Sequence, residues 1–265
     1  MEDLRRLKEA VKGKRILLLG PPGSGKGNRS RDLEALGLVH IGLGIILRAR
    51  TRKDPDSELS QKISRMMKRG SLIPDEIVVP IVMDRLNQPD CQECGFVLDG
   101  FPRTKVQADL LFSKFDLDLA LHLNVPKAHL INGIIRFNRR SCIKCAAGYS
   151  DFDPPREEGI CDRCGNQVVR RPGDNLEVVK TRLKIYEQEI EAFLPDLEAK
   201  GIVEALPITV SDNEEIEDKY LKKLGDKIYL VRTDEGGKAR MLNLKGMQRR
   251  LYDLLAKRFS DCSLK

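Results

Sequence analysis

Seven consecutive residues near the start of the chain carry the clearest chemical signal, Gly20-Pro21-Pro22-Gly23-Ser24-Gly25-Lys26. They follow a short apolar run, Arg15 to Leu19, which is typical of a buried parallel strand. Glycines let backbone N–H groups converge on an anion, and a helix that begins there directs its positive end at the same point. Lys26 would add a mobile charge for the outer phosphates. The pattern predicts a P-loop that binds a nucleoside triphosphate.

The P-loop departs from the common pattern at the residues after Lys26. Gly27 and Asn28 stand where a hydroxyl residue often binds Mg²⁺, so we expect the metal to be held mainly by phosphates and water. The residues of this loop that we expect to bind ATP are Pro22, Gly23, Ser24, Gly25, Lys26, Gly27 and Asn28.

Four cysteines have the spacing of a metal site. Cys142 and Cys145 form one C-x-x-C pair, and Cys161 and Cys164 form a second, with fifteen residues between the pairs. Two such pairs complete a tetrahedron of thiolates with no open position, which predicts structural zinc. Two disulfides in an oxidising compartment are the alternative. A third pair, Cys91 and Cys94, is by itself a weak signal.

A carboxylate and several arginines complete the candidate chemistry. Asp99 ends an apolar run over 95–99, where a carboxylate beside a P-loop can order the water around Mg²⁺. Arg103 presents a planar fork that suits a phosphate. Phosphoryl transfer spreads negative charge over the moving group, so positioned cations are what catalysis requires. The other candidate cations are Arg136, Arg140, Arg171 and Arg182.

The elements that must position these residues alternate between strand and helix. Strands are predicted over 15–19, 38–41, 95–99, 119–125 and 202–206, and helices over 29–36, 45–50, 57–70, 74–86, 130–138 and 176–194. This βαβα order predicts an α/β fold with a three-layer parallel sheet. Right-handed crossovers would then place the P-loop at the carboxyl edge of the sheet, where such folds bind ligands.

Composition narrows the class of protein. The 265 residues are 41% hydrophobic and carry a formal net charge of +7, which suits an enzyme acting on polyanionic phosphates better than a nucleic-acid-binding protein. No apolar run is long enough to span a membrane, and the charged segment over 1–15 has no apolar signal core. We therefore expect a cytoplasmic protein without a membrane partner.

The last forty residues, 226–265, read as a basic extension with a net charge of +5. Two β-like runs flank residues 234–237, a glycine-containing hairpin signal, and a helix is predicted over 247–259. That helix carries an apolar stripe, so we expect it to pack on the core or on a second copy of the chain. Nucleic-acid binding by its basic residues is the alternative. The apolar stripe consists of Leu251, Leu254, Leu255 and Phe259.

Over about residues 14–225 the chain resembles adenylate kinases, of the nucleoside monophosphate kinase family, that carry a zinc-binding lid. The resemblance rests on the P-loop, the four cysteines and the runs over 70–76, 99–104 and 171–175, followed by Arg182 and Tyr186. It implies a P-loop kinase core with an AMP-binding insertion near 40–70 and a lid near 136–175. It also implies Mg²⁺-dependent, reversible phosphoryl transfer from ATP to AMP, giving two ADP.

The resemblance also assigns roles to individual residues. Lys26 and Arg136 would contact the ATP phosphates, and Arg48 and Arg103 the AMP phosphate. Gln107 would read the adenine edge, since an amide both donates and accepts. The arginines implied to converge on the transferred group are Arg140, Arg171 and Arg182.

Several polar residues of the family pattern are replaced. Gly42-Leu43-Gly44-Ile45 stands where the family usually has Ser-Thr-Gly-Asp, and Asn28 and Gly173 replace a threonine and an aspartate. These changes predict lower activity or weaker discrimination among monophosphates. They leave two alternatives to an adenylate kinase: a related kinase with another acceptor, and a nucleotide- or RNA-binding homologue with little turnover.

Overall fold

Five parallel strands in the order β2-β3-β1-β4-β8 form the central sheet of the computed structural model. The strands are β1 (Arg15–Leu19), β2 (Val39–Gly42), β3 (Phe96–Asp99), β4 (Leu119–Asn124) and β8 (Val203–Pro207). The structure describes residues 2–126, 129–130, 134–135, 138–171, 173–210, 214–221, 223–224, 227–228, 230–232 and 238–260. The predicted parallel sheet is confirmed, and β1 lies between β3 and β4 so that the P-loop leaves its centre.

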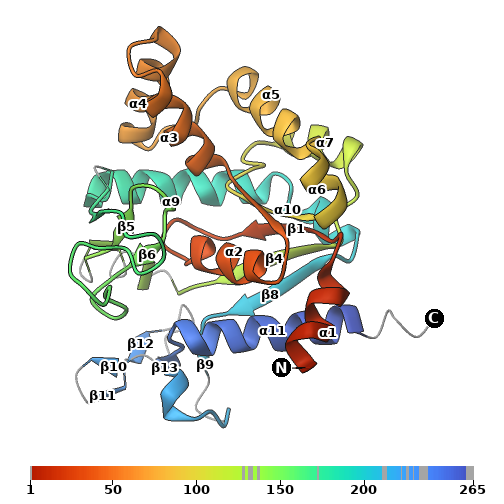
Figure 1. Ribbon diagram of the computed structural model, residues 1–265, viewed down its shortest axis with the longest axis vertical. Helices are drawn as coiled ribbons and strands as arrows, with labels where there is room; N and C mark the ends of the chain where they lie inside the picture. The colour runs from red at the N-terminus through yellow and green to blue at the C-terminus, as the bar shows by residue number, and fades with distance from the viewer. Residues whose placement is uncertain are drawn as a thin grey trace.

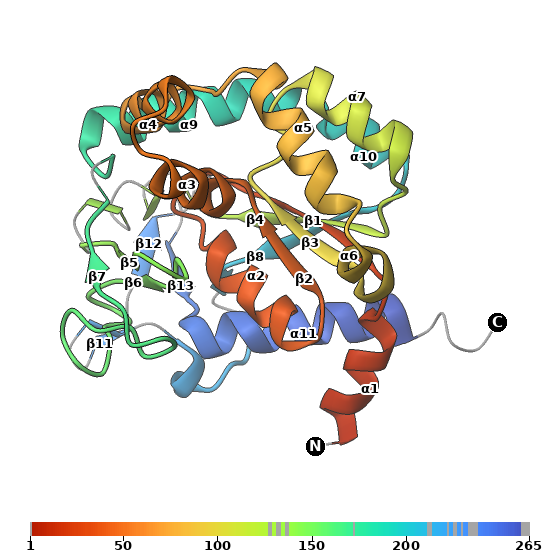
Figure 2. The same ribbon diagram turned by 45° about the horizontal axis from the view of Figure 1, so that its top comes forward.

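Helices cover both faces of the sheet and make three layers (Figure 2). One face carries α1 (Glu2–Val11), α2 (Lys26–Ala35) and α11 (Leu244–Ser260). The other carries α5 (Asp75–Leu86), α6 (Pro89–Cys94), α7 (Lys105–Lys114), α9 (Leu176–Glu191) and α10 (Leu194–Ala199). Strand β1 shows why: Ile16 and Leu18 enter the core of the first face, and Leu17 and Leu19 that of the second.

Two smaller units extend over the carboxyl edge of the sheet (Figure 1). The first is an arm of two helices, α3 (Leu43–Lys53) and α4 (Glu58–Arg69). Ser57 caps α4 by accepting a hydrogen bond from the Ser60 backbone N–H, and Gly70 ends it in the left-handed conformation, φ 75°. The second is an antiparallel sheet, β6-β5-β7, formed by β5 (Arg140–Cys142), β6 (Gly148–Tyr149) and β7 (Val168–Val169).

Two predicted helices need comment. The helix predicted over 176–194 ends at Glu191, and a second helix, α10, begins at Leu194 with Pro195 in its first turn. The helix predicted over 130–138 falls largely outside the described residues.

The C-terminal segment adds short strands and the last helix. These elements are β9 (Thr209–Val210), a 3₁₀ turn (Asp218–Tyr220), β10 (Lys223–Leu224), β11 (Lys227–Ile228), β12 (Leu230–Arg232), β13 (Lys238–Met241) and α11. β12 and β13 pair antiparallel as the hairpin signal predicts, while the turn itself, 233–237, lies outside the described residues. β13 also pairs with β9, which directly follows β8 of the central sheet, so the segment after residue 226 is joined to the main fold by hydrogen bonds as well as by the chain.

Helix α11 belongs to the main core of the same chain. Leu251, Leu255 and Phe259 are buried in the cluster that also contains Leu7 and Val11 of α1, and the two helices lie side by side (Figure 1). The apolar stripe therefore packs on the core, the first of its two predicted partners. No helix of the described part is long and apolar enough to cross a membrane.

Basic residues of α11 make contacts within the chain. Arg250 donates to the carbonyls of Pro207 and Thr209, 3.0 and 2.7 Å away, and Arg258 donates to the carbonyl of Gly201 at 3.1 Å. Two of the basic residues that suggested nucleic-acid binding thus hold α11 against the rest of the chain. Self-association through this segment stays a prediction.

Candidate active site

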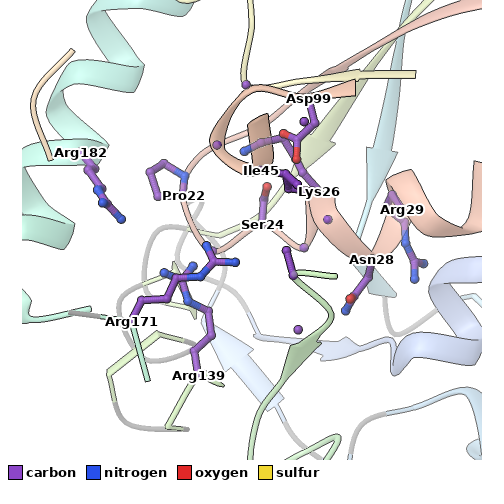
Figure 3. Close-up of a pocket in the computed structure, with 18 of the residues that line it drawn as sticks. Pro22, Ser24, Lys26, Asn28, Arg29, Ile45, Asp99, Arg139, Arg171 and Arg182 are labelled. Atoms are coloured by element: carbon purple, nitrogen blue, oxygen red, sulfur yellow. The ribbon is translucent and has the colours of Figure 1, made fainter. Parts of the chain in front are cut away.

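A cavity of about 380 Å³ lies at the carboxyl edge of the central sheet. The P-loop, the arm, the end of β3, the small antiparallel sheet and the start of α11 all contribute to its walls. Figure 3 shows the charged side chains that line it, with Lys26 and Asp99 together on one side and Arg139 and Arg171 together on another. Its place agrees with the ligand site expected for a parallel α/β sheet.

The P-loop is shaped to receive an anion. Gly25 has φ 88°, and a Cβ atom placed there would meet no atom within 4 Å, so the loop leaves open space beside its backbone. Ser24 is 4% exposed, and its hydroxyl has no hydrogen-bond partner among the described residues. Open space and an unpartnered donor at the start of α2 are the features of a phosphate site.

Lys26 is held at the mouth of this loop. Its ammonium group donates to the carbonyls of Gly20 and Pro21, the latter at 3.1 Å. Burial lowers its pKa to about 8; Asp99 opposes the shift, and Arg103 and Arg139 add to it. A buried ammonium group that lies close to other cations favours the binding of an anion in this cavity.

Arg171 shows the same excess of positive charge. Burial lowers its pKa to about 9, and Arg139 and Arg48 lower it further by repulsion. Its Nε donates to the Ser141 hydroxyl at 2.8 Å, which fixes the guanidinium toward the cavity. The lysine and arginine residues that line the cavity are Lys26, Arg29, Arg31, Arg48, Arg103, Arg139, Arg140, Arg171 and Arg182.

Of the two consecutive arginines, Arg139 and Arg140, the first is the one that interacts with the catalytic candidates. Arg139 forms an ion pair with Asp174, whose side chain is fully buried, and its charge acts on Lys26, Arg171 and Arg182. Arg140 also lines the cavity, but it pairs with Asp151 at 3.4 Å and Glu158 at 3.7 Å.

Arg139 and Asp174 are not among the residues that the sequence predicts for the site. The adjacent pair of arginines was the available signal. Both arginines line the cavity, and the partner of each is set by contacts between segments rather than by the local pattern.

Three further predicted residues line the acceptor side of the cavity. Arg182 donates from α9 to the Met67 carbonyl at 3.0 Å and so spans to the end of the arm. Arg48 projects from α3, and burial lowers its pKa, with Arg52 and Arg182 adding to the shift. Arg103 follows β3 and lines the same cavity. Gly173 leaves room for this arrangement, since a Cβ atom there would lie 3.0 Å from Arg182 Nη2.

Gln107 is 1% exposed and already bonded on both sides of its amide. Its Oε1 accepts from the Arg103 backbone N–H at 2.7 Å, and its Nε2 donates to Asp75 at 2.7 Å. Asp75 also accepts from the Thr104 hydroxyl at 3.0 Å. One N–H and one lone pair of the amide stay available for a ligand, while the existing bonds fix the backbone that carries Arg103.

The side chains around Asp99 show whether the cavity offers ligand atoms that suit Mg²⁺. Asp99 lies at the end of β3, and its charge acts on Lys26, so a hard oxygen ligand faces the phosphate site. Ile45 lies near both in Figure 3 and offers no ligand atom. The Asn28 side chain accepts a hydrogen bond from Arg31. Arg136, predicted to contact ATP, lies outside the described residues.

The four cysteine sulfurs form one cluster and can hold a metal ion. All four lie within 4.8 Å of one another, with Cys142 3.5 Å from Cys164 and Cys145 3.6 Å from Cys161. Four thiolates around zinc at about 2.3 Å would be separated by roughly 3.8 Å, so the cluster fits a tetrahedral ion. The thiols are free, which leaves the disulfide alternative without support.

Hydrogen-bond donors surround these sulfurs. The Tyr149 hydroxyl donates to the Cys161 sulfur at 3.3 Å, and the Lys144 backbone N–H donates to that of Cys142 at 3.4 Å. Such donors stabilise thiolate ligands. Cys91, from the third pair, is buried against Arg85, outside this cluster.

The C-terminal segment forms part of the cavity wall. Residues at the junction of β13 and α11 line the same cavity as Tyr149 and Phe152 of the lid. Sequence analysis did not place these residues in the site, because no local motif marks them. The apolar wall residues are Ile208, Met241, Leu242, Leu244 and Met247.

One buried carboxylate gives a pH prediction. Glu189 on α9 has an Oε1 atom without a hydrogen-bond partner among the described residues, and burial raises its pKa from 4.5 to about 7, with Arg103 opposing. The folded state therefore holds this proton more tightly than the unfolded chain. Its contribution to stability is fully present below about pH 4.5 and is lost as the pH rises through about 7.

We expect Glu189→Gln to raise the unfolding temperature much more at pH 8 than at pH 5, because the amide keeps the shape of the side chain and removes the charge. Thermal unfolding of both proteins between pH 5 and pH 8 measures the difference. A difference that does not change with pH would contradict the prediction.

Comparisons with known proteins agree with this geometry. The family model described as adenylate kinase matches residues 18–202. The chain is 38% identical over 210 residues to the adenylate kinase of Methanosarcina mazei, covering 77% of this chain and 95% of that protein. It is 39% identical over 208 residues to that of Carboxydothermus hydrogenoformans (76% and 94%), and 38% identical over 221 residues to that of Caldicellulosiruptor saccharolyticus (80% and 99%). On the match to the family model and these identities over most of its length, the chain belongs to the adenylate kinase family, a family of phosphotransferases.

Proposed function

We propose that this protein catalyses the reversible, Mg²⁺-dependent transfer of a phosphoryl group from ATP to AMP, giving two ADP. The observation that carries the proposal is the convergence of cations from the P-loop, the arm, α9 and the lid on one cavity, where burial and mutual repulsion lower the pKa of Lys26 to about 8 and that of Arg171 to about 9. Two polyphosphorylated substrates would supply the missing negative charge.

The donor half of the site is the P-loop side. The backbone amides over 22–28 and the Lys26 ammonium would bind the ATP phosphates, with Arg136 as a further contact implied by the resemblance. Asp99 would order the water around the Mg²⁺ that accompanies ATP, and that ion would neutralise developing phosphate charge. The apolar wall at the start of α11 is the natural place for the donor base.

The acceptor half is the arm side. Arg48 and Arg103 would bind the AMP phosphate, and the free N–H and lone pair of Gln107 would meet the adenine edge. Leu43, buried at 5% exposure, lines this half without offering a hydroxyl. We therefore expect the protein to accept AMP but to discriminate less against other monophosphates than a kinase with a hydroxyl residue at this position.

The chemistry needs no covalent enzyme intermediate. An AMP phosphate oxygen would attack the γ-phosphorus of ATP, and the bond from that phosphorus to the β-phosphate oxygen would break to release ADP. Arg139, Arg171 and Arg182 would hold the transferred group, and the lid, closed over the cavity, would exclude water. Zinc bound by the four cysteines would be structural, since four protein ligands leave no open position.

An acceptor panel tests the proposal. Initial rates with ATP and each of AMP, GMP, CMP and UMP would be measured in a coupled assay, with and without Mg²⁺. We expect AMP to be the best acceptor and turnover to require Mg²⁺. A clear preference for CMP or UMP would assign the protein to a related kinase, and ATP binding without turnover on any acceptor would refute catalysis.

The two consecutive arginines give a separate prediction. Arg139→Lys should lower kcat about 100-fold, because an ammonium keeps the charge opposite Asp174 but loses the fork that holds a phosphoryl group. The matched variant Arg140→Lys should lose at most about threefold, because Arg140 pairs with exposed carboxylates. Steady-state kinetics of both decide the assignment, and a larger loss in Arg140→Lys would reverse it.

A further inference from the structure

Arg31 lies on the P-loop helix α2, and its guanidinium donates one hydrogen bond to the lid and one within its own helix. Its Nη2 donates to the Asn28 side-chain oxygen, and its Nη1 donates to the Ala146 carbonyl at 3.2 Å. Asn28 is two residues from Lys26, and Ala146 directly follows the zinc-site residue Cys145. A single half-buried side chain thus connects the two parts of the site that must meet when the lid closes.

Asn28 itself points toward the lid. Figure 3 shows its side chain directed away from Asp99. A Cβ atom at Gly148 of β6 would lie 3.5 Å from its Oδ1 atom, so the lid strand passes close to it. The residue that replaces the usual P-loop hydroxyl therefore serves here as the acceptor for Arg31.

A second pair lies one turn further along α2. Arg163, which lies between Cys161 and Cys164, places its Nη2 atom 2.6 Å from the Glu34 Oε2 atom. The Glu34 and Arg163 side chains are 38% and 45% exposed. Exposed ion pairs contribute little, so this pair adds less to lid closure than the half-buried Arg31. Arg163 provides a control, because it also joins α2 to the lid but does so through an exposed ion pair.

We propose that Arg31 is a positioning residue that holds the zinc-site lid closed over the P-loop, and that it sets the affinity for the donor nucleotide rather than for the acceptor. The inference rests on the proposed function for the identity of the two nucleotides. The bond to Ala146 spans to the lid, and the bond to Asn28 within α2 orients the guanidinium that makes it, so losing Arg31 shifts the lid toward open states. An open lid withdraws Arg139 and Arg171 from the phosphates of ATP, while Arg48 and Arg103 stay in place.

Binding and lid position test this without turnover. The dissociation constants for ATP and for AMP would each be measured by titration. The distance between labels at Glu158 on the lid and Val106 on α7 would be measured with and without ATP; both side chains are exposed. Labels would be introduced through non-natural amino acids, because the chain has seven cysteines.

We expect Arg31→Met to weaken ATP binding about tenfold, to leave AMP binding within about twofold and to lengthen the label distance with ATP bound. Arg31→Lys should recover part of the loss, since an ammonium can reach one acceptor but does not reproduce the fork. Arg163→Met should change ATP affinity by at most about twofold. Unfolding temperature and metal content should match the wild type in all three.

Unchanged ATP affinity and label distance in Arg31→Met would overturn the proposal. So would equal weakening of ATP and AMP, or a loss of bound metal, because either would mark Arg31 as merely structural. If Arg31→Met does not fold, the comparison of Arg31→Lys with Arg163→Met decides on the same readouts. Absence of phosphoryl transfer by the wild type would refute the proposed function and leave these binding results standing.

Discussion

Lys26→Met should lower turnover with ATP and AMP by several orders of magnitude and leave the protein folded. In the proposed mechanism Lys26 supplies the ammonium beside the ATP phosphates, and its charge would act where negative charge develops in the transition state. Its pKa is lowered from 10.5 to about 8 in the folded state, so stability from this group increases only as the pH rises from about 8 to about 10.5. At pH 7 the buried charge opposes folding, and the unfolding temperature of the variant should not fall.

The measurement is kcat together with thermal unfolding at pH 7. Lys8→Met is the control, because it makes the same substitution at an exposed lysine. Lys8 lies on α1, which packs beside α11 and does not line the cavity. The Lys8→Met variant should keep wild-type turnover. Near-normal turnover in Lys26→Met would remove Lys26 from the mechanism, and a strongly lowered unfolding temperature would show that its bonds to Gly20 and Pro21 matter for folding instead.

Loss of the metal should unfold the lid and abolish most of the activity. Among the described residues, the buried members of the lid cluster are Cys142, Ala147, Cys161 and Val168, and two of these four are candidate metal ligands. Such a small core cannot compensate for the entropy of ordering the lid, so binding of the metal has to supply the folding free energy. Cys161→Ser should therefore lose the bound metal and disorder the segment that carries Arg139 and Arg171.

The central core should survive this change, because its two clusters contain none of the four ligands. Metal analysis, hydrogen exchange of the lid and kcat would be measured on Cys161→Ser, with Cys94→Ser as the control outside the metal cluster. We expect one metal ion per chain in the control and none in the variant, with kcat reduced at least about 100-fold. Retained metal, or a lid that stays protected in Cys161→Ser, would contradict a structural metal site.

The sequence by itself determined the parts of the fold that depend on local pattern. The strand at 15–19, the glycine loop after it and the cap at Gly70 are each encoded within a few residues, by apolar runs, turn residues and backbone freedom. The four cysteines were equally readable, since two C-x-x-C pairs can close one tetrahedron with little choice. These local signals were enough for the parallel sheet, the P-loop and the metal cluster.

Only the tertiary structure decided which side chains meet. Arg139 lines the cavity and pairs with Asp174, which lies 35 positions away and is buried against it. Gln107 is held by Asp75 on another helix, and α11 enters the main core beside α1. Each outcome is a contact between segments distant in sequence, fixed by strand register and by shared burial of apolar faces. A local pattern can specify a side chain's chemistry, but packing of the whole chain sets its direction and its partner.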